Sequence, residues 1–191
     1  TGYSFAGWSD TPTSSTASYT NSQSVSNLTA IKDDSVTLYA VWTANTYTVT
    51  FANGGGTGTM ENQSFTHDVA SALNTNAFSK TGYIFAGWKE GTTTYVNGES
   101  ISATANMTLT AQWTPISYSV KFDANGGTGN LANQAFIYNV AQNLTTNTFS
   151  RTGYTFAGWN TAANGTGTSR ADGTSVSNLT AIKDGIVTLY A

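Results

Sequence analysis

One eight-residue motif, Thr-Gly-Tyr-x-Phe-Ala-Gly-Trp, occurs three times in this chain, at residues 1–8, 81–88 and 152–159. The flanking residues match as well. Residues 47–88 align with 118–159 at a shift of 71, and residues 1–40 align with 152–191 at a shift of 151. Between Trp88 and Leu109 the second copy is nine residues shorter than the third. A period of this length predicts an array of small modules in place of one large domain.

Short apolar runs with period-two alternation predict several strands in each module. They are expected at 3–8 and 36–42, at 47–51, 61–67, 83–88 and 107–113, and at 118–122, 136–138, 154–159 and 187–191. The glycine-rich stretch at 54–58 and its counterpart at 123–130 predict turns or wide loops.

Residues 68–73 and 139–144 are predicted to form one or two helical turns. Asp68 is a suitable N-cap, and Val69, Ala72 and Leu73 follow at helical spacing. One unit of about 70 residues therefore reads β-β-α-β-β. That order predicts an α+β fold of tandem, small, β-grasp-like units that are mostly β.

The repeat boundaries predict three segments. Residues 1–42 form a partial repeat, the C-terminal half of a unit, residues 43–113 a complete repeat, and residues 114–191 a near-complete one. Linkers at 43–46 and 114–117 are short enough to predict a semi-rigid array. Two readings of the partial repeat stay open: it borrows strands from a neighbouring molecule, or the folding unit is permuted, so that 1–80 and 81–151 are complete and 152–191 is the half.

The rings of the repeated motif are expected to fill the interior of each module, since a small domain has few other large side chains for its core. A platform for a sugar or a peptide is the less favoured alternative. The predicted core of the middle repeat consists of Val49, Phe51, Phe65, Leu73, Tyr83, Phe85, Trp88 and Trp113.

Composition excludes several classes of function. The chain has no Cys, so it contains no disulfide and no thiolate ligand. Its net charge is -3 with only 9% charged residues, which disfavours nucleic acid as a partner. No run of 18 apolar residues occurs, so no membrane insertion is expected. The chain starts and stops inside a repeat, which predicts a piece of a longer protein.

No catalytic, cofactor-binding or metal-binding residue can be assigned from the sequence, and the ligand-binding residues are unknown, so we expect no enzyme and no cofactor. His67 is the only His, and an aromatic role at a strand edge is predicted for it. The carboxylates Glu61, Asp68, Glu90 and Glu99 form no acid pair that recurs in another repeat. A calcium loop at 123–130 is a weak alternative, because Ala52 and Gly54 of the middle repeat cannot supply the same oxygen ligands.

Four cations recur in pairs. Lys80 and Arg151 precede the motif and are predicted to pack their stems on a ring. Lys32 and Lys183 precede an Asp, where a solvated turn is favoured over an isopeptide crosslink.

Three motifs carry a resemblance to a known family: Phe-Asp-Ala-Asn-Gly-Gly at 122–127, Thr-Gly-Tyr-Thr-Phe-Ala-Gly-Trp at 152–159, and Leu-Thr-Ala-Gln-Trp at 109–113. In these the chain resembles the Listeria-Bacteroides repeat, the internalin B-repeat type, over its whole length. It departs from the family pattern at Ala52, where the family has Asp. The resemblance implies a β-grasp unit, ubiquitin-like or SUMO-like.

The resemblance also implies a function and a location. Such repeats act as stalks and adhesive spacers of large bacterial surface proteins, so we expect a non-enzymatic module that is extracellular, at the bacterial cell surface or cell wall. Neighbouring repeats of the same chain are its expected partners, with a host or bacterial surface protein or a glycan as candidates outside the chain. The alternative is a glycan- or protein-ligand-binding module that uses exposed aromatic residues.

Overall fold

The computed structural model describes residues 1–191, and all of its regular structure is β. Contacts divide the chain into two compact units. One comprises Thr1–Ala52, Met60–Asn76 and Lys89–Thr110, and the other comprises Asn53–Thr59, Ala77–Trp88 and Ala111–Ala191. The division runs through the middle repeat (43–113). The first repeat (1–42) lies in one unit and the third repeat (114–191) in the other.

The third repeat contains a five-stranded sheet in the order β11-β10-β16-β13-β14. Its strands are β10 (Ser117–Asp123), β11 (Gln134–Ile137), β13 (Trp159–Asn160), β14 (Ser169–Arg170) and β16 (Ile186–Tyr190). The interior strand β10 pairs antiparallel with β11 and parallel with the central strand β16. A second, two-stranded sheet pairs β12 (Gln142–Asn143) with β15 (Ser175–Val176).

The alternation of apolar residues in β10 explains why this strand lies inside the sheet, between β11 and β16. Tyr118, Val120 and Phe122 point to one face and are buried, while Ser119 and Lys121 alternate with them and lie at more accessible positions. The core around them is completed by side chains from both sheets and the loops: Phe136, Leu144, Trp159, Val176 and Leu189. One face of a small sheet thus holds the interior of the repeat.

The middle repeat has the same topology, with the strand order β4-β3-β9-β6-β7. Its strands are β3 (Thr46–Ala52), β4 (Gln63–Thr66), β6 (Tyr83–Glu90), β7 (Thr93–Tyr95) and β9 (Met107–Pro115), with β5 (Ser71–Ala72) paired to β8 (Ser100–Ile101). Of the predicted core, Val49, Phe51, Phe65, Leu73 and Trp88 are buried. Tyr83, Phe85 and Trp113 are only half-buried.

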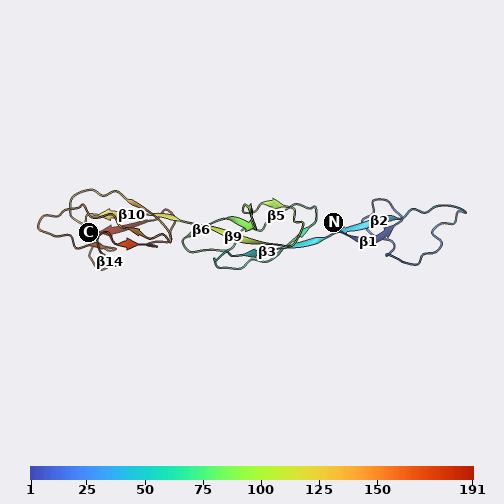
Figure 1. Ribbon diagram of the computed structural model, residues 1–191, viewed down its shortest axis with the longest axis horizontal. Helices are drawn as coiled ribbons and strands as arrows, with labels where there is room; N and C mark the ends of the chain where they lie inside the picture. The colour runs from blue at the N-terminus through green and yellow to red at the C-terminus, as the bar shows by residue number, and fades with distance from the viewer. The chain divides into compact units, whose positions relative to one another are not determined.

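The first repeat contains one two-stranded sheet, formed by β1 (Tyr3–Ser9) and β2 (Tyr39–Ala44), which lie side by side in Figure 1. A bulge interrupts the register between Phe5 and Gly7. Gly7 has a φ of 142° and faces the carbonyl of Tyr19, so a side chain has no room there. Because β2 pairs with β1 alone, Trp42 remains 57% exposed.

The predicted helical turns at 68–73 and 139–144 are wrong, and with them the α+β, β-grasp, ubiquitin-like or SUMO-like prediction. Asp68 and Asn139 have φ angles of 60° and 63°, a left-handed conformation that closes a tight turn and cannot cap a helix in the predicted way. The amide of Val69 donates to the carbonyl of Thr66 at 3.1 Å. In place of the helices lie the short strands β5 and β12.

Polar groups hold this segment extended. The Gln63 amide donates to the carbonyl of Ala72 at 2.7 Å, and its oxygen accepts from the amide of Asn74 at 2.8 Å. Leu73 donates its backbone N–H to the carbonyl of Glu99 at 2.8 Å. These side-chain and cross-strand partners satisfy backbone groups that a helix would have paired internally.

The predicted linkers are also shorter than expected. β2 ends at Ala44 and β3 begins at Thr46, while β9 ends at Pro115 and β10 begins at Ser117. Only Asn45 and Ile116 separate the strands of adjacent repeats. The residues at 43–46 and 114–117 are therefore mostly β-strand.

Candidate functional site

The residue between β9 and β10 joins two repeats through its backbone. The amide of Ile116 donates to the carbonyl of Gly82 in the middle repeat at 2.9 Å. Its own carbonyl accepts from the amide of Tyr138 in the third repeat, also at 2.9 Å. The side chain of Ile116 is buried. One residue thus connects the motif of one repeat to the hairpin of the next. We call such a contact between successive repeats a joint.

The ring of Tyr138 covers Gly82 at this joint. A Cβ placed on Gly82 would collide with the Tyr138 ring carbons, and its φ of 77° is unfavourable for any other residue. The rings of Tyr138 and Tyr83 meet edge to face, with centroids 5.8 Å apart. The Thr-Gly-Tyr half of the motif therefore serves as a contact surface for the following repeat.

The first and middle repeats are joined in the same way. The amide of Asn45 donates to the carbonyl of Gly2 at 2.9 Å, and the carbonyl of Asn45 accepts from the amide of His67 at 2.8 Å. The His67 ring occupies the space where a Cβ on Gly2 would lie. It also meets the ring of Tyr3 edge-on, with centroids 5.3 Å apart. The predicted aromatic role of His67 at a strand edge is confirmed.

The first joint has polar contacts that involve side chains. The Tyr3 hydroxyl donates to Asp68 Oδ2 at 3.1 Å, and Asp68 Oδ1 lies 3.5 Å from His67 Nε2. The hydrogen bond to Asp68, and then its negative charge, raise the pKa of Tyr3 above the ordinary tyrosine value. Asp68, which was expected to cap a helix, is instead part of the joint.

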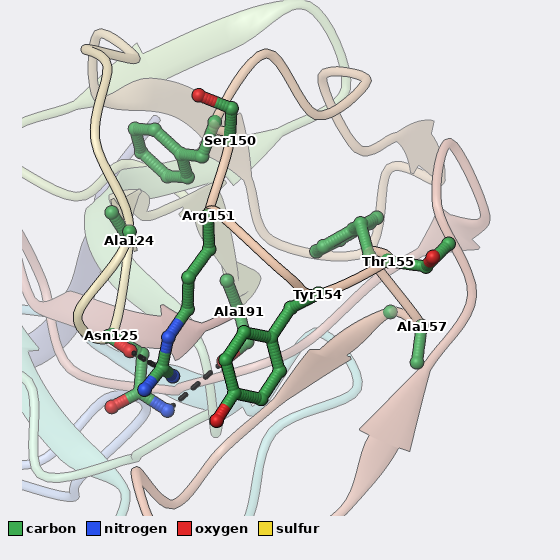
Figure 2. A pocket seen from close by; sticks show the side chains of 12 residues that line it. Ala124, Asn125, Ser150, Arg151, Tyr154, Thr155, Ala157 and Ala191 are labelled. Atoms are coloured by element: carbon green, nitrogen blue, oxygen red, sulfur yellow. Dashed lines mark hydrogen bonds between the residues drawn. The ribbon is translucent and has the colours of Figure 1, made fainter.

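The second and third copies of the motif are each preceded by a cation that stacks on the tyrosine of the motif. Lys80 Nζ lies 4.6 Å from the centroid of the Tyr83 ring, and the Arg151 guanidinium lies 4.3 Å from that of Tyr154. Figure 2 shows the Arg151 side chain running alongside the Tyr154 ring. The predicted contact with a ring is present, but the charged group of each side chain, and not its stem, lies over the ring.

The third repeat also contains a hollow of about 550 Å³ beside this pair. Among its lining residues are Asn125, Gly127, Phe156 and Ala191. The Asn125 amide donates to the carbonyl of Ala191 at 2.9 Å, and Arg151 Nη1 donates to the carbonyl of Asn125 at 3.3 Å, as Figure 2 shows. This hollow corresponds to the place of a tryptophan ring in the middle repeat.

In the middle repeat, the equivalent place holds the indole of Trp113. At the shift of 71, Gly54, Gly56 and Phe85 are the counterparts of Asn125, Gly127 and Phe156. The indole lies close to both glycines, and its centroid is 5.8 Å from that of Phe85. Its Nε1 donates to the carbonyl of Asn53 at 2.8 Å. The hollow of the third repeat therefore corresponds to the place that the half-buried Trp113 indole occupies in the middle repeat.

The other groups singled out in the sequence have local partners. Asp123 Oδ1 accepts from the amide of Asn125 at 2.9 Å, which forms a turn within the proposed calcium loop. No group of three or more His, Asp and Glu side chains gathers anywhere in the chain. Lys32 pairs with Asp33 at 3.9 Å and Lys183 with Asp184 at 3.3 Å, at exposed turns.

Sequence reasoning missed the joints, although a signal for them was present. Gly2, Gly82 and Gly153 occupy the same motif position, and His67 and Tyr138 align at the shift of 71. Both observations concern residues of different repeats, and periodicity within one repeat does not pair them. Their pairing required coordinates.

Comparison with known proteins places these features in a family. The family model described as the Listeria-Bacteroides repeat domain matches residues 1–41, 47–112 and 118–191. A protein of Evansella cellulosilytica named "Putative membrane protein" is 34% identical over 145 residues, which cover 73% of this chain and 21% of the relative. Another from the same organism, named "Putative Gly-rich membrane protein", is 32% identical over 135 residues, covering 66% of this chain and 16% of the relative.

The chain thus spans about a fifth of the length of the curated relatives that it matches. The structure contains no helix long and apolar enough to cross a membrane. The motif matches extend over nearly the whole chain, in three successive copies. The chain belongs to the Listeria-Bacteroides repeat family.

Proposed function

We propose that this chain is a non-enzymatic, tandem-repeat spacer of a bacterial surface protein, with repeat boundaries at 1–42, 43–113 and 114–191. The observation that carries this proposal is the joint between repeats, which is built twice from the same positions. In both joints one residue links a motif glycine to the hairpin of the next repeat, and an aromatic ring covers that glycine. A module that orders its neighbour is suited to hold a distal domain at a distance.

The location at the cell envelope is supported by the relatives, since both are named as membrane proteins. An extracellular position, and a contribution to adhesion through many weak contacts, extend this proposal. In this proposal, the binding partners of each repeat are the neighbouring repeats of the same chain.

The spacer proposal can be tested by loosening one joint. Gly82→Ala introduces a side chain against the Tyr138 ring, and Gly153→Ala is its matched control, because the two glycines have φ angles of 77° and 78° but Gly153 has no atom within 4 Å of an added Cβ. The chain has no Cys, so two dyes can be attached through one introduced Cys in the middle repeat and one in the third.

Energy transfer between the dyes reports how firmly the repeats are held. We expect a narrow distribution of transfer efficiencies in the parent and in Gly153→Ala, and a broad one in Gly82→Ala. Equal distributions in all three proteins would contradict the proposal that the joint orders the array.

A second candidate, the binding of a glycan or protein ligand by exposed rings, is favoured by one observation. Trp42 is 57% exposed and Tyr154 is 68% exposed. A glycan array probed with the parent and with Trp42→Ala and Tyr154→Ala separates the two functions. Binding that is lost in both variants would support the ligand-binding candidate over the spacer.

A further inference from the structure

The main chain at the first joint carries unpaired backbone groups at Ala44 and Thr46. Between them, Asn45 directs both of its backbone groups to one side, where its N–H donates to Gly2 and its carbonyl accepts from His67. Successive residues of an extended chain direct these groups to opposite sides, so the N–H and carbonyl groups of Ala44 and Thr46 point away from β1 and β4. We call this stretch of backbone the open edge.

β9 does not cover the open edge, because its pairing with β3 begins too far along the strand. The first paired residues are Val49 and Met107. One residue earlier, the Thr48 N–H donates to the side-chain oxygen of Asn106 at 2.9 Å. No hydrogen bond joins residues 102–106 to the backbone of the open edge.

In the third repeat, the chain itself covers the equivalent backbone. Ser117 is the counterpart of Thr46 at the shift of 71. Asp184 donates its N–H to the carbonyl of Ser117 at 2.8 Å, and Ser119 donates its N–H to the carbonyl of Gly185 at 2.9 Å. The Ser117 hydroxyl also donates to Asp184 Oδ1 at 3.1 Å. A short extended segment is therefore what this position of the sheet accepts.

The two repeats differ here in the length of one internal loop. In the third repeat, residues 177–186 separate the strand position of Val176 from the first residue that pairs opposite Val120. In the middle repeat, only residues 102–106 span the same interval. The shorter loop lies between strands that are both present, so the open edge is a property of the middle repeat itself.

The smaller number of strands in the first repeat does not create the open edge either. Ser4 and Thr43 of the first repeat lie beside it. Their counterparts in the five-stranded middle repeat are Ile84 and Thr114, which are exposed as well. A repeat with all of its strands therefore leaves this side of the joint accessible.

A shallow groove of about 760 Å³ lies along the open edge, and none of its lining residues is charged. Neutral polar side chains predominate among them: Ser4, Thr43, Asn45, Thr46, Thr104 and Asn106. Such surroundings offer no counter-charge to an ion. Backbone donors and acceptors at strand spacing instead match an extended peptide, which presents the complementary N–H and carbonyl groups.

The second joint lacks this site for two reasons. The counterpart of Ala44 is Pro115, which has no N–H to donate. The carbonyl of Ser117 is already occupied by the N–H of Asp184. An added strand can therefore pair at the first joint and not at the second.

We propose that the open edge binds an extended peptide segment of a partner protein, which pairs with Ala44 and Thr46 as an added strand. The segment takes the place that residues 183–186, Lys-Asp-Gly-Ile, occupy in the third repeat. An Asp of the segment accepts from the Thr46 hydroxyl, as Asp184 accepts from Ser117. This binding site goes beyond the spacer function and does not depend on it.

The test is an NMR titration of the intact, isotope-labelled chain with a synthetic peptide. The probe copies residues 180–187, Thr-Ala-Ile-Lys-Asp-Gly-Ile-Val, with both ends capped. In the control peptide, a methyl group on the backbone nitrogen of Asp removes the donor to Thr46. In the protein, Ala44→Pro removes the N–H of the open edge, and Pro115 shows that this strand position accepts proline.

We expect the probe to cause saturable shifts of the Ala44 and Thr46 amides. The affinity should be at least about tenfold lower for the methylated peptide, and for the probe with Ala44→Pro, because each change removes a hydrogen bond of the added strand. The Ser117 amide at the closed counterpart should not shift. The absence of saturable shifts at the open edge, or equal affinity for the two peptides, would overturn the site.

A loop exchange provides a second, independent variant. Replacing residues 102–106 with residues 177–186 should close the open edge and abolish the shifts, so undiminished binding would contradict the site. The methylated peptide is tested on the parent chain, and its result therefore holds even where a variant does not fold. Shifts at the open edge with chitohexaose, but not with the peptide, would assign the groove to a glycan and reject the peptide site.

Discussion

At the scale of single residues, each joint depends on a glycine that two separate constraints require: its backbone conformation and the space beside it. Gly2 and Gly82 adopt positive φ angles, and each also lies beneath an aromatic ring that leaves no space for a Cβ. At Gly153 only the positive φ angle applies, because no atom lies within 4 Å of an added Cβ. The same glycine position is therefore constrained differently in different copies of the motif.

The first joint should depend on pH through Tyr3. Its pKa is raised above 10.0 in the folded protein, chiefly by the hydrogen bond to Asp68. The contribution of this contact to stability is thus complete below the unfolded pKa of 10.0 and is lost as the pH rises through the higher folded value.

An NMR titration of the Tyr3 ring measures this shift directly. In Asp68→Ala the pKa of Tyr3 should return toward 10.0, because both the acceptor and the charge are removed. Asp33→Ala, which alters an aspartate at an exposed turn, serves as the control. A Tyr3 titration that is the same in all three proteins would refute the assignment.

At the scale of elements, the decisive feature is a tight turn where a helix was expected. Asp68 and Asn139 adopt a left-handed conformation, which Asp and Asn tolerate better than other side chains do. The residues after them run extended, so that their apolar members do not share one face. Leu144 is 2% exposed, whereas Val140 is 50% exposed.

Two alanine substitutions distinguish the turn from a helix. Leu144→Ala should cost about 2–5 kcal/mol of unfolding free energy, because it removes a buried side chain from the core. Val140→Ala should cost less than about 0.5 kcal/mol, as expected for an exposed position. Urea denaturation of both variants provides the measurement. Comparable losses would indicate that both residues face the core, as on a helix.

At the scale of the whole molecule, the three repeats differ in how completely they are built. The sheets of the middle and third repeats each have five strands, while β1 and β2 form a sheet of two. An isolated two-stranded sheet is only marginally stable in water, because it buries little apolar surface.

Amide exchange should therefore differ along the chain. Backbone amides in β1 and β2 should exchange at least about tenfold faster than those in β10 and β16, since opening two strands disrupts fewer contacts than opening the core of the third repeat. Hydrogen exchange followed by NMR on the intact chain tests this. Equal protection would show that the joint with the middle repeat stabilises β1 and β2 as much as the sheet of the third repeat stabilises its own strands.

The sequence by itself determined the repeats, most strands and the core positions that alternate along them. Val49 and Phe51 are buried as their period-two spacing predicted, and Phe65 and Trp88 are buried as expected for large aromatic side chains of a small domain. The sequence also identified the family, because the order and spacing of the family motifs can be recognised without a structure. These properties depend on residues that are close in the chain, where spacing alone decides which side chains share a face.

The tertiary structure alone decided the turn at Asp68 and the joints. A segment with helical spacing became extended because Gln63 and Glu99, both outside it, supply partners for its backbone. The contact of Tyr138 with Gly82 joins residues of different repeats, and no local pattern specifies which ring covers which glycine. Hydrogen-bond partners and packing neighbours that are distant in the chain decided what local propensity could not.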